Sequence, residues 1–273
     1  MNGFDMHIHS NSSDGQLDVC KIIDIARNVP GLTGISITDH DTVAALPRAI
    51  SYAKKYNYPL IPGIELSAAY EEYDVHILGF WIDISTIMAN GCLQQLCAAR
   101  QERFYNMAYR LGLLGMPIDA EAVVAGTAGT GNALGRLHIA QAMVAAGYVE
   151  HIEEAFTNWL GRGMPAYAPR LKFNPEEAIE LIAEARGIAV LAHPGMGVPD
   201  HVVGRLVGLG LGGLEVYHSA HDDKAVNKYL QMAGQYHIAA LGGSDFHRPG
   251  QRYIGSHITS PEQLQFLNKR RKW

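Results

Sequence analysis

The sequence has few of the features that mark secreted, membrane and thiolate-metal proteins. Its three cysteines, Cys20, Cys92 and Cys97, form no CxxC pair and leave one thiol over in any pairing, so we expect neither a disulfide framework nor a thiolate metal site. No apolar run reaches the roughly 18 residues of a spanning helix, and the N-terminus lacks the basic region and apolar core of a signal peptide. These absences predict a cytoplasmic protein that does not contact a membrane.

Positive charge is also scarce. Lys and Arg total 22 against 27 Asp and Glu, which gives the 273-residue chain a net charge of −5. A chain with this balance has no broad basic surface, so we expect no long duplex nucleic acid as a partner. A small phosphorylated ligand stays open, because metal ions can supply positive charge locally. The composition does not indicate an oligomeric state.

Two common catalytic motifs are missing. No GxSxG elbow marks a nucleophilic serine. The glycine-rich stretch 125–135 lacks the GK[ST] of a phosphate-binding loop and the preceding strand of a dinucleotide site, so we interpret it as a hinge or lid. Hydrophobic residues make up 48% of the chain and charged residues 18%, which is typical of a folded globular protein.

Short apolar runs alternate with helical patterns in two parts of the chain, 1–82 and 169–273. Strand, helix and strand at short intervals indicate βαβ units and an α/β fold with a parallel sheet or barrel. Between them, 83–168 has longer helical patterns, including one at 90–114 with apolar residues at helical spacing. We therefore expect one barrel domain, interrupted by a helical insertion that covers the active site.

The chain contains 13 histidines, several of them at the ends of predicted strands. In the extended stretch FDMHIHS, His7 and His9 lie on one face, which indicates a metal site or, alternatively, a polar strand face. Further metal-binding residue types follow other predicted strands, and in a parallel barrel such strand ends meet on one face. The nine candidate ligands are His7, His9, Asp14, His40, Glu65, His76, His193, Asp245 and His247.

Nine candidates are too many for one ion and enough for two or three. Because nitrogen and oxygen ligands are present without thiolates, the set suits Mn²⁺, and Zn²⁺ or Fe²⁺ as alternatives, better than copper(I) or an iron–sulfur cluster.

Seven motifs in order, HIHS, SDG, TDHD, GIELS, VHILG, LAHPG and GSDFH, resemble the polymerase and histidinol phosphatase (PHP) family of metal-dependent phosphoesterases. The insertion is similar to that of the branch that acts on nucleotide bisphosphates and the 5′ ends of short RNA. This resemblance implies a distorted (β/α)₇ barrel with three divalent metal ions.

The resemblance also implies how the nine ligands divide among the three metals. The first would be held by His7, His9, Glu65 and Asp245, with Glu65 bridging to a second at His76 and His193. Asp14, His40 and His247 would hold the third metal. Many members of the family have histidine where this chain has Asp14, which could retune that site.

Four further residues are candidates for contact with substrate. Arg136 follows the glycine-rich loop at the start of a predicted helix, where it is either an exposed surface arginine or a clamp on a substrate phosphate. His138 lies two residues on. His218 is either a phosphate contact or proton donor, or an ordinary loop histidine, and Tyr217 offers a ring on which a base can stack.

Two aspartates flank His40. Asp39 either orients a ligand histidine or caps the helix that follows, whereas we expect Asp41 to be the helix cap.

The sequence therefore predicts a hydrolase that cleaves a nucleotide phosphate ester, such as a 3′,5′-bisphosphate, or the 5′ end of a short oligoribonucleotide, by attack of a metal hydroxide. A histidinol-phosphate phosphatase uses the same chemistry and is one alternative. An amidohydrolase acting on C–N bonds is another, although no predicted central strand carries the lysine of a carbamylated bridge. The third is a non-catalytic metal-binding module.

Overall fold

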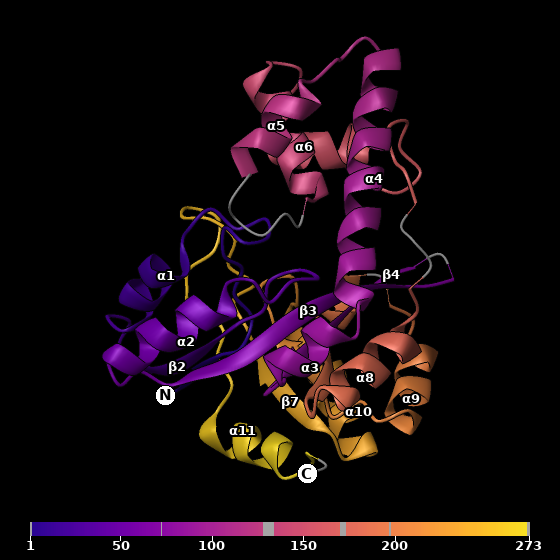
Figure 1. Ribbon diagram of the computed structural model, residues 1–273. Helices are drawn as coiled ribbons and strands as arrows, with labels where there is room; N and C mark the ends of the chain where they lie inside the picture. The colour runs from indigo at the N-terminus through magenta and orange to yellow at the C-terminus, as the bar shows by residue number, and fades with distance from the viewer. Residues whose placement is uncertain (1, 72, 128–133, 170–172, 197, 272–273) are drawn as a thin grey trace.

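The computed structural model describes residues 2–71, 73–127, 134–169, 173–196 and 198–271, and within these ranges seven strands alternate with helices (Figure 1). The elements in chain order are β1 (Gly3–Asp5), α1 (Val19–Ala26), β2 (Leu32–Ile37), α2 (Leu46–Lys55), β3 (Leu60–Tyr70), β4 (Tyr73–Phe80), α3 (Ile84–Ala89), α4 (Cys92–Leu113), α5 (Ala120–Thr127), α6 (Arg136–Ala145), α7 (Ile152–Ala155), the π-helical η1 (Phe156–Leu160), α8 (Pro175–Glu184), β5 (Ile188–Leu191), the 3₁₀-helical η2 (Pro194–Met196), α9 (Asp200–Gly208), β6 (Gly213–Tyr217), α10 (Asp223–Tyr236), β7 (Ala239–Gly242) and α11 (Pro261–Asn268).

The seven strands form one sheet in sequence order, β1 to β7. β1, β2 and β3 are mutually parallel, as are β5, β6 and β7. β4 is antiparallel to both of its neighbours, so the expectation of a wholly parallel sheet is wrong at this strand. The sheet is nevertheless the distorted seven-stranded barrel that the resemblance implied.

Hydrogen bonds beyond the ends of β1 and β7 bring the two sides of the sheet together. The amide of Asp245 donates to the carbonyl of His7 at 2.8 Å, and the amide of His9 donates to the carbonyl of Phe246 at 2.9 Å. These bonds nearly close the barrel, and they set the two candidate ligands that follow β1 beside one that follows β7.

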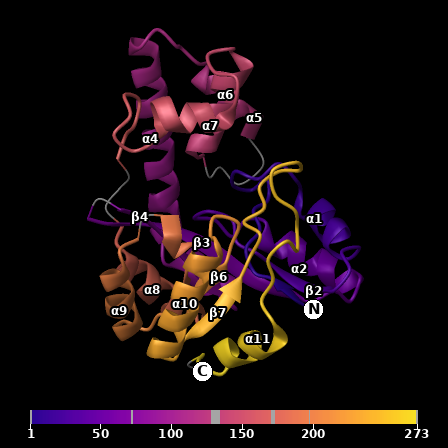
Figure 2. The same cartoon turned by 180° about the vertical axis from the view of Figure 1, so that it is seen from behind.

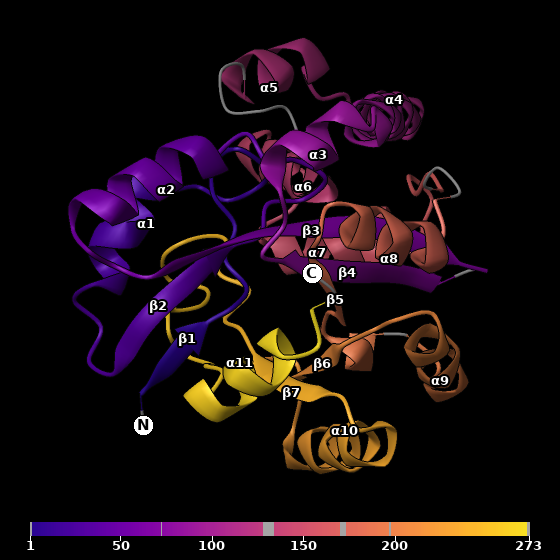
Figure 3. The same cartoon turned by 60° about the horizontal axis from the view of Figure 1, so that its bottom comes forward.

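Alternate residues along the strands divide the sheet into an outer and an inner face. The outer face packs against helices that surround the barrel (Figure 3), in a core that includes Ile64 and Ile77. The inner face carries apolar side chains at one end, among them Ile61, Leu78 and Val190, which pack with Leu267 of α11. Farther along the same inner face, β3 and β4 present polar residues instead, and this change in character locates the site.

The segment predicted as an insertion has apolar packing of its own. Phe104, Met107 and Leu111 of α4 pack in a core that extends to Ala168. The first part of α4, including Leu93, packs instead in the outer core of the barrel. Figures 1 and 2 show this long helix rising from the sheet to α5 and α6. One helix thus belongs to both cores and connects them.

The structure tests only in part the two expectations about the glycine-rich stretch and about membrane-spanning helices. Residues 125–127 of the glycine-rich stretch belong to α5, and 128–133 lie outside the described residues, so the hinge or lid stays a prediction. In the part of the chain that the structure describes, no helix is long and apolar enough to cross a membrane.

A matched pair of glycine substitutions tests the packing where the barrel closes. At Gly243 an added Cβ would contact the Cβ of His7 and lie 2.7 Å from Glu215 Oε1, so Gly243→Ala should destabilise the protein by about 1–3 kcal/mol. At Gly234, in α10, an added Cβ meets nothing within 4 Å, and Gly234→Ala should stabilise by up to about 1 kcal/mol. Thermal unfolding measures both changes; equal melting temperatures for the two variants would contradict the close approach.

Candidate active site

The candidate site lies at the polar end of the inner face, where four side chains converge from β3 and from the segments that follow β1 and β7. The ring nitrogens Nε2 of His7 and His9 are 3.0 Å apart. Glu65 Oε2 lies 3.3 Å from the first and 3.2 Å from the second, and Asp245 Oδ1 lies 3.4 and 3.2 Å from them. Ligand atoms about 2.0–2.2 Å from one cation are about 3.0–3.4 Å apart in tetrahedral or octahedral sets. The four atoms therefore have the spacing of one metal site.

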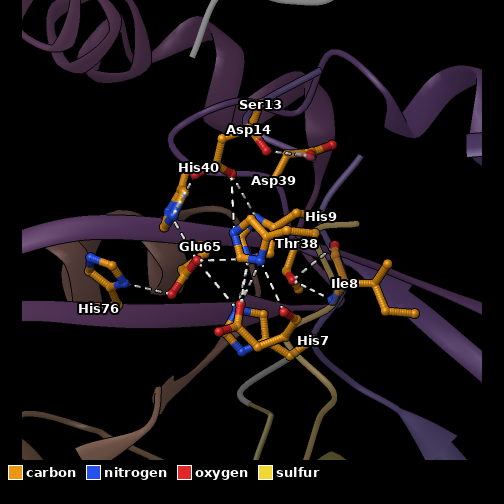
Figure 4. Close-up of polar contacts among 12 residues, drawn as sticks. His7, Ile8, His9, Ser13, Asp14, Thr38, Asp39, His40, Glu65 and His76 are labelled. Carbon is orange, nitrogen blue, oxygen red and sulfur yellow. Dashed lines mark hydrogen bonds and ion pairs between the residues drawn. The ribbon is translucent and has the colours of Figure 1, made fainter. Parts of the chain in front are cut away.

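The second oxygen of Glu65 faces two other histidines. Glu65 Oε1 lies 2.8 Å from His76 Nδ1 and 3.3 Å from His193 Nε2. Figure 4 shows Glu65 between these groups, with His76 on one side and His7 and His9 on the other. Glu65 thus has the position that a bridging carboxylate requires.

The third group surrounds Asp14, at the end of the site shown uppermost in Figure 4. Asp14 Oδ1 lies 3.3 Å from His247 Nε2, and Asp14 Oδ2 lies 3.8 Å from His40 Nε2. His9 Nδ1 is 3.7 Å from Asp14 Oδ1, and His40 Nδ1 is 2.9 Å from Glu65 Oε2. His9 and His40 therefore each face two groups, and all nine predicted ligands are brought together.

Several buried atoms in the site have no hydrogen-bond partner among the described residues, although they lie close to one another. They are His9 Nδ1, Asp14 Oδ1, His40 Nδ1 and Glu65 Oε2. Leaving such groups unpaired is costly in a protein interior, and lone pairs that point to a common centre fit a cation. Imidazole and carboxylate donors also match the ligand chemistry of divalent transition metals. The residues present therefore fit metal ions.

The electrostatics of the site also favour bound cations. Burial raises the pKa of Glu65, but the neighbouring His40, His76 and His7 outweigh this effect and hold the pKa well below its usual range. Burial lowers the pKa of His9, but the carboxylates of Asp245 and Glu65 outweigh it and raise that pKa to about 10. The ionised carboxylates thus favour a proton on His9, which a metal ion would replace on binding.

Glu215 of β6 supports this cluster, and the sequence analysis missed it. Its Oε1 accepts a hydrogen bond from His7 Nδ1 at 2.9 Å, which leaves His7 Nε2 to face the cluster. Its Oε2 accepts from the amide of His193 at 2.8 Å. Carboxylates of this kind orient ligand histidines and fix their tautomer. A single charged residue within the apolar stretch GGLEVY was the signal in the sequence that could have identified it.

The two aspartates beside His40 anchor loops of the site. Asp39 accepts hydrogen bonds from Ser10 and Ser13 at 2.6–2.7 Å, so it fixes the loop after His9 and caps no helix. Asp41 accepts from the amide of Ser67 and pairs with Arg100. The expectation that Asp41 caps the next helix is wrong, because α2 begins only at Leu46 and has no side-chain cap.

A cavity of about 460 Å³ opens above the site, and seven of the nine candidate ligands line it. His7 and His9 lie fully buried beneath. The facing wall comes from the helices after the glycine-rich stretch and includes Leu137, Ile152 and Phe156. Three arginines also line the cavity. They are Arg100, Arg136 and Arg252, of which the sequence analysis identified only Arg136.

The predicted substrate residues differ in their placement. Arg136 lines the cavity, and its Nη2 lies 3.2 Å from Asp74 Oδ2. His138 accepts a hydrogen bond from the amide of Gly135 at the start of α6, in a second hollow beside Asp14. Among the described residues that line the main cavity, neither His138 nor Tyr217 is found.

His218 is buried beside Asp245. The amide of Ala220 donates to His218 Nδ1 at 3.1 Å, so the ring proton is on Nε2, which lies 3.3 Å from Asp245 Oδ2. This contact favours a role in positioning Asp245 over proton transfer to a substrate.

Comparison with known proteins gives consistent relatives. No model of a protein family matches the chain. A 3′,5′-nucleoside bisphosphate phosphatase from Chromobacterium violaceum is 30% identical over 257 residues, which cover 92% of this chain and 89% of that protein. The 5′-3′ exoribonuclease Rnm from Salmonella typhimurium is 32% identical over 253 residues, which cover 90% of this chain and 85% of that protein.

Solved structures agree with these relatives in fold. A crystal structure from Bifidobacterium adolescentis, assigned as a metal-dependent phosphoesterase, superposes with a TM-score of 0.91 at 30% identity and covers 100% of this chain and 97% of that one. A structure from Chromobacterium violaceum named an amidohydrolase, with bound sulfate and no metal, has a TM-score of 0.88 at 29% identity and covers 98% of this chain and 96% of that one. Together with the convergence of the nine predicted ligands, these relatives place the chain in the PHP family of metal-dependent phosphoesterases.

Proposed function

We propose that this phosphoesterase hydrolyses a phosphate ester of a nucleotide, such as a 3′,5′-bisphosphate, or the 5′ end of a short oligoribonucleotide. The observation that carries the proposal is the set of adjoining ligand groups around Glu65, at the floor of a cavity with arginines in its walls. The relatives named as a bisphosphate phosphatase and an exoribonuclease support this substrate class.

The nine ligands would hold three divalent ions, with Mn²⁺ first and Zn²⁺ or Fe²⁺ as alternatives. When bound, such ions acidify water and stabilise negative charge on a phosphoryl group. Glu65 would connect the first two ions through its two oxygens, while Glu215 and His218 keep His7 and Asp245 in place. His9 and His40 each face two groups, so occupancy of the third site depends on how these rings are shared.

Arg136 would bind a non-bridging phosphate oxygen. Its guanidinium lines the cavity, and the pair with Asp74 holds it between α6 and β4. Arginine suits this task because its N–H groups match the geometry of phosphate oxygens.

The helical segment 83–168 would act as an insertion over the barrel formed by 1–82 and 169–273. Its contribution to the cavity is largely apolar, through Leu137, Ile152 and Phe156. A flat nucleobase fits an apolar wall that includes an aromatic ring. We therefore assign the base contact to this wall, with Phe156 in the role first predicted for Tyr217. A cytoplasmic location stays a prediction from the sequence.

A substrate panel tests the proposed reaction. The protein loaded with Mn²⁺ should release phosphate from adenosine 3′,5′-bisphosphate, or mononucleotides from a short 5′-phosphorylated RNA, faster than it releases phosphate from histidinol phosphate. Phosphate colorimetry and chromatography measure both products. Turnover of amide substrates without any phosphoester cleavage would favour the amidohydrolase alternative, and histidinol phosphate as the best substrate would favour the other.

Two substitutions of different severity test the metal ligands. His9→Ala removes a ring that faces two ligand groups, so it should abolish turnover and reduce bound metal. Glu215→Gln removes only the carboxylate behind His7, so it should weaken metal binding about 10- to 100-fold and leave activity that excess metal restores. Elemental analysis and metal titration measure both effects. Full metal content in His9→Ala would contradict the assignment.

Removal of Arg136 should affect substrate binding and spare the metals. Arg136→Ala loses a charge-assisted contact, so KM should rise about 10- to 100-fold while metal content stays unchanged. Arg48→Ala is a matched control, because Arg48 is also ion-paired with an aspartate, Asp18, but is exposed on α2. If both variants had the kinetic constants of the wild type, Arg136 would have no part in phosphate binding.

A further inference from the structure

The three arginines of the cavity wall differ in how neighbouring residues engage them. Every nitrogen of Arg100 is hydrogen-bonded within the protein. Its Nε contacts Asp41, its Nη1 contacts the carbonyl of Leu134 at 3.3 Å, and its Nη2 contacts Ser67 Oγ. This arginine therefore connects α4 to the segments that contain Asp41, Ser67 and Leu134, and it has no free edge to offer a ligand.

Arg252 is engaged on one side only. Its Nη1 donates to Asp245 Oδ2 and, at 3.0 Å, to the carbonyl of Asp245. Its Nε and Nη2 make no hydrogen bond to the residues that the structure describes. Because Nη1 lies on the Cδ side of a guanidinium, Nε and Nη2 form the opposite edge, and their two N–H groups are parallel. This edge is the one that binds carboxylate or phosphate through two hydrogen bonds.

Asp245 connects this arginine directly to the first ligand group. Its Oδ1 lies 3.2 Å from His9 Nε2 and 3.4 Å from His7 Nε2, whereas its Oδ2 faces Arg252 and His218. One carboxylate thus divides its two oxygens between the metal group and the arginine. A phosphate on the outer edge of Arg252 would lie beside the ions and not remote from them.

The loop that carries Arg252 is anchored near its end. Gly255 N donates to Asp5 Oδ2 at 2.7 Å, and Asp5 is fully buried. The same carboxylate accepts from Ser244 N at 2.9 Å, next to Asp245. The Asp5 carboxylate therefore anchors the loop on both sides, next to Asp245 and close to Arg252. Figures 1 and 2 show this loop, which follows β7, rising from the barrel toward α5 and α6. Such anchoring reduces the entropy lost when the arginine binds a ligand.

We propose that Arg252 is a second phosphate-binding residue of the site, which receives two oxygens of the substrate phosphoryl group on its Nε and Nη2 edge. This inference rests on the proposed function for the identity of the substrate. The ligand class that the edge recognises is a tetrahedral phosphate, whether esterified or free. With Arg136 on α6 and Arg252 on the loop after β7, the phosphate would be held from two different parts of the chain.

The test compares Arg252→Lys with Arg248→Lys. Lysine keeps the positive charge near Asp245 but has no two-donor edge, so Arg252→Lys should raise KM for the phosphoester at least ~10-fold and weaken binding of inorganic phosphate by a similar factor. Arg248 lies on the same loop but outside the cavity lining, so Arg248→Lys should match the wild type. Steady-state kinetics, calorimetric titration of the metal-loaded protein with inorganic phosphate, and elemental analysis supply the three measurements.

The outcomes separate this inference from the proposed function. If the wild type cleaves no phosphoester but Arg252→Lys still weakens phosphate binding, the proposed function fails and the role of Arg252 stands. If Arg252→Lys binds phosphate as the wild type does, the proposal is overturned, whatever the activity. It is also overturned if Arg252→Lys loses metal while each fully loaded molecule keeps the phosphate affinity of the wild type, because the arginine would then only anchor Asp245.

Discussion

The site depends on one buried carboxylate at the floor of the cavity. Glu65 is fully buried on the inner face of β3, and five histidine rings lie within 3.3 Å of its two oxygens. An ionised carboxylate without compensating charge is costly in such a place, so the surrounding rings must bring protons or metal ions. Those rings belong to different strands or to the segments that follow them. The need of Glu65 for compensating charge therefore constrains the course of the chain at the ends of several strands.

Buried aspartates that are not candidate ligands hold these strand ends in place. Asp39 binds the loop after His9, Asp41 binds the chain after Glu65, and Asp5 binds the segments around Asp245 and Arg252. Burial raises the pKa of Asp5 to about 6 even though three backbone amides donate to it, which shows how far this group lies from solvent. These hydrogen bonds connect the loops of the site to one another through side chains that are not candidate ligands.

The convergence of the nine candidate ligands could be predicted from the sequence because each lies in a short local motif near a strand, and the barrel brings such positions together. The direction of β4 was also readable: only residues 71 and 72 separate β3 from β4, and a parallel crossover needs a dozen or more. The partners of Asp41 and Arg252 were not readable. Asp41 takes a positive φ of 53° and turns from the helix that follows it to Arg100, 59 residues away. Arg252 lies in an irregular loop, where no periodicity indicates which way a side chain points.

The connection between barrel and helical segment keeps the candidate metal ligands on a different element from the apolar wall of the cavity. Two of the ion pairs between them, Arg136 with Asp74 and Arg248 with Glu153, are partly exposed, and pairs of this kind contribute little to stability. The buried contact of Arg100 with Asp41, together with α4 packed in both cores, must then set the orientation of the segment. Asp41 follows the candidate ligand His40, so the same contact that holds the cavity wall also supports the cluster of candidate ligands. If the apolar wall contacts the base as proposed, substitutions there would change which base fits while this contact, and with it the cluster of candidate ligands, stays unchanged.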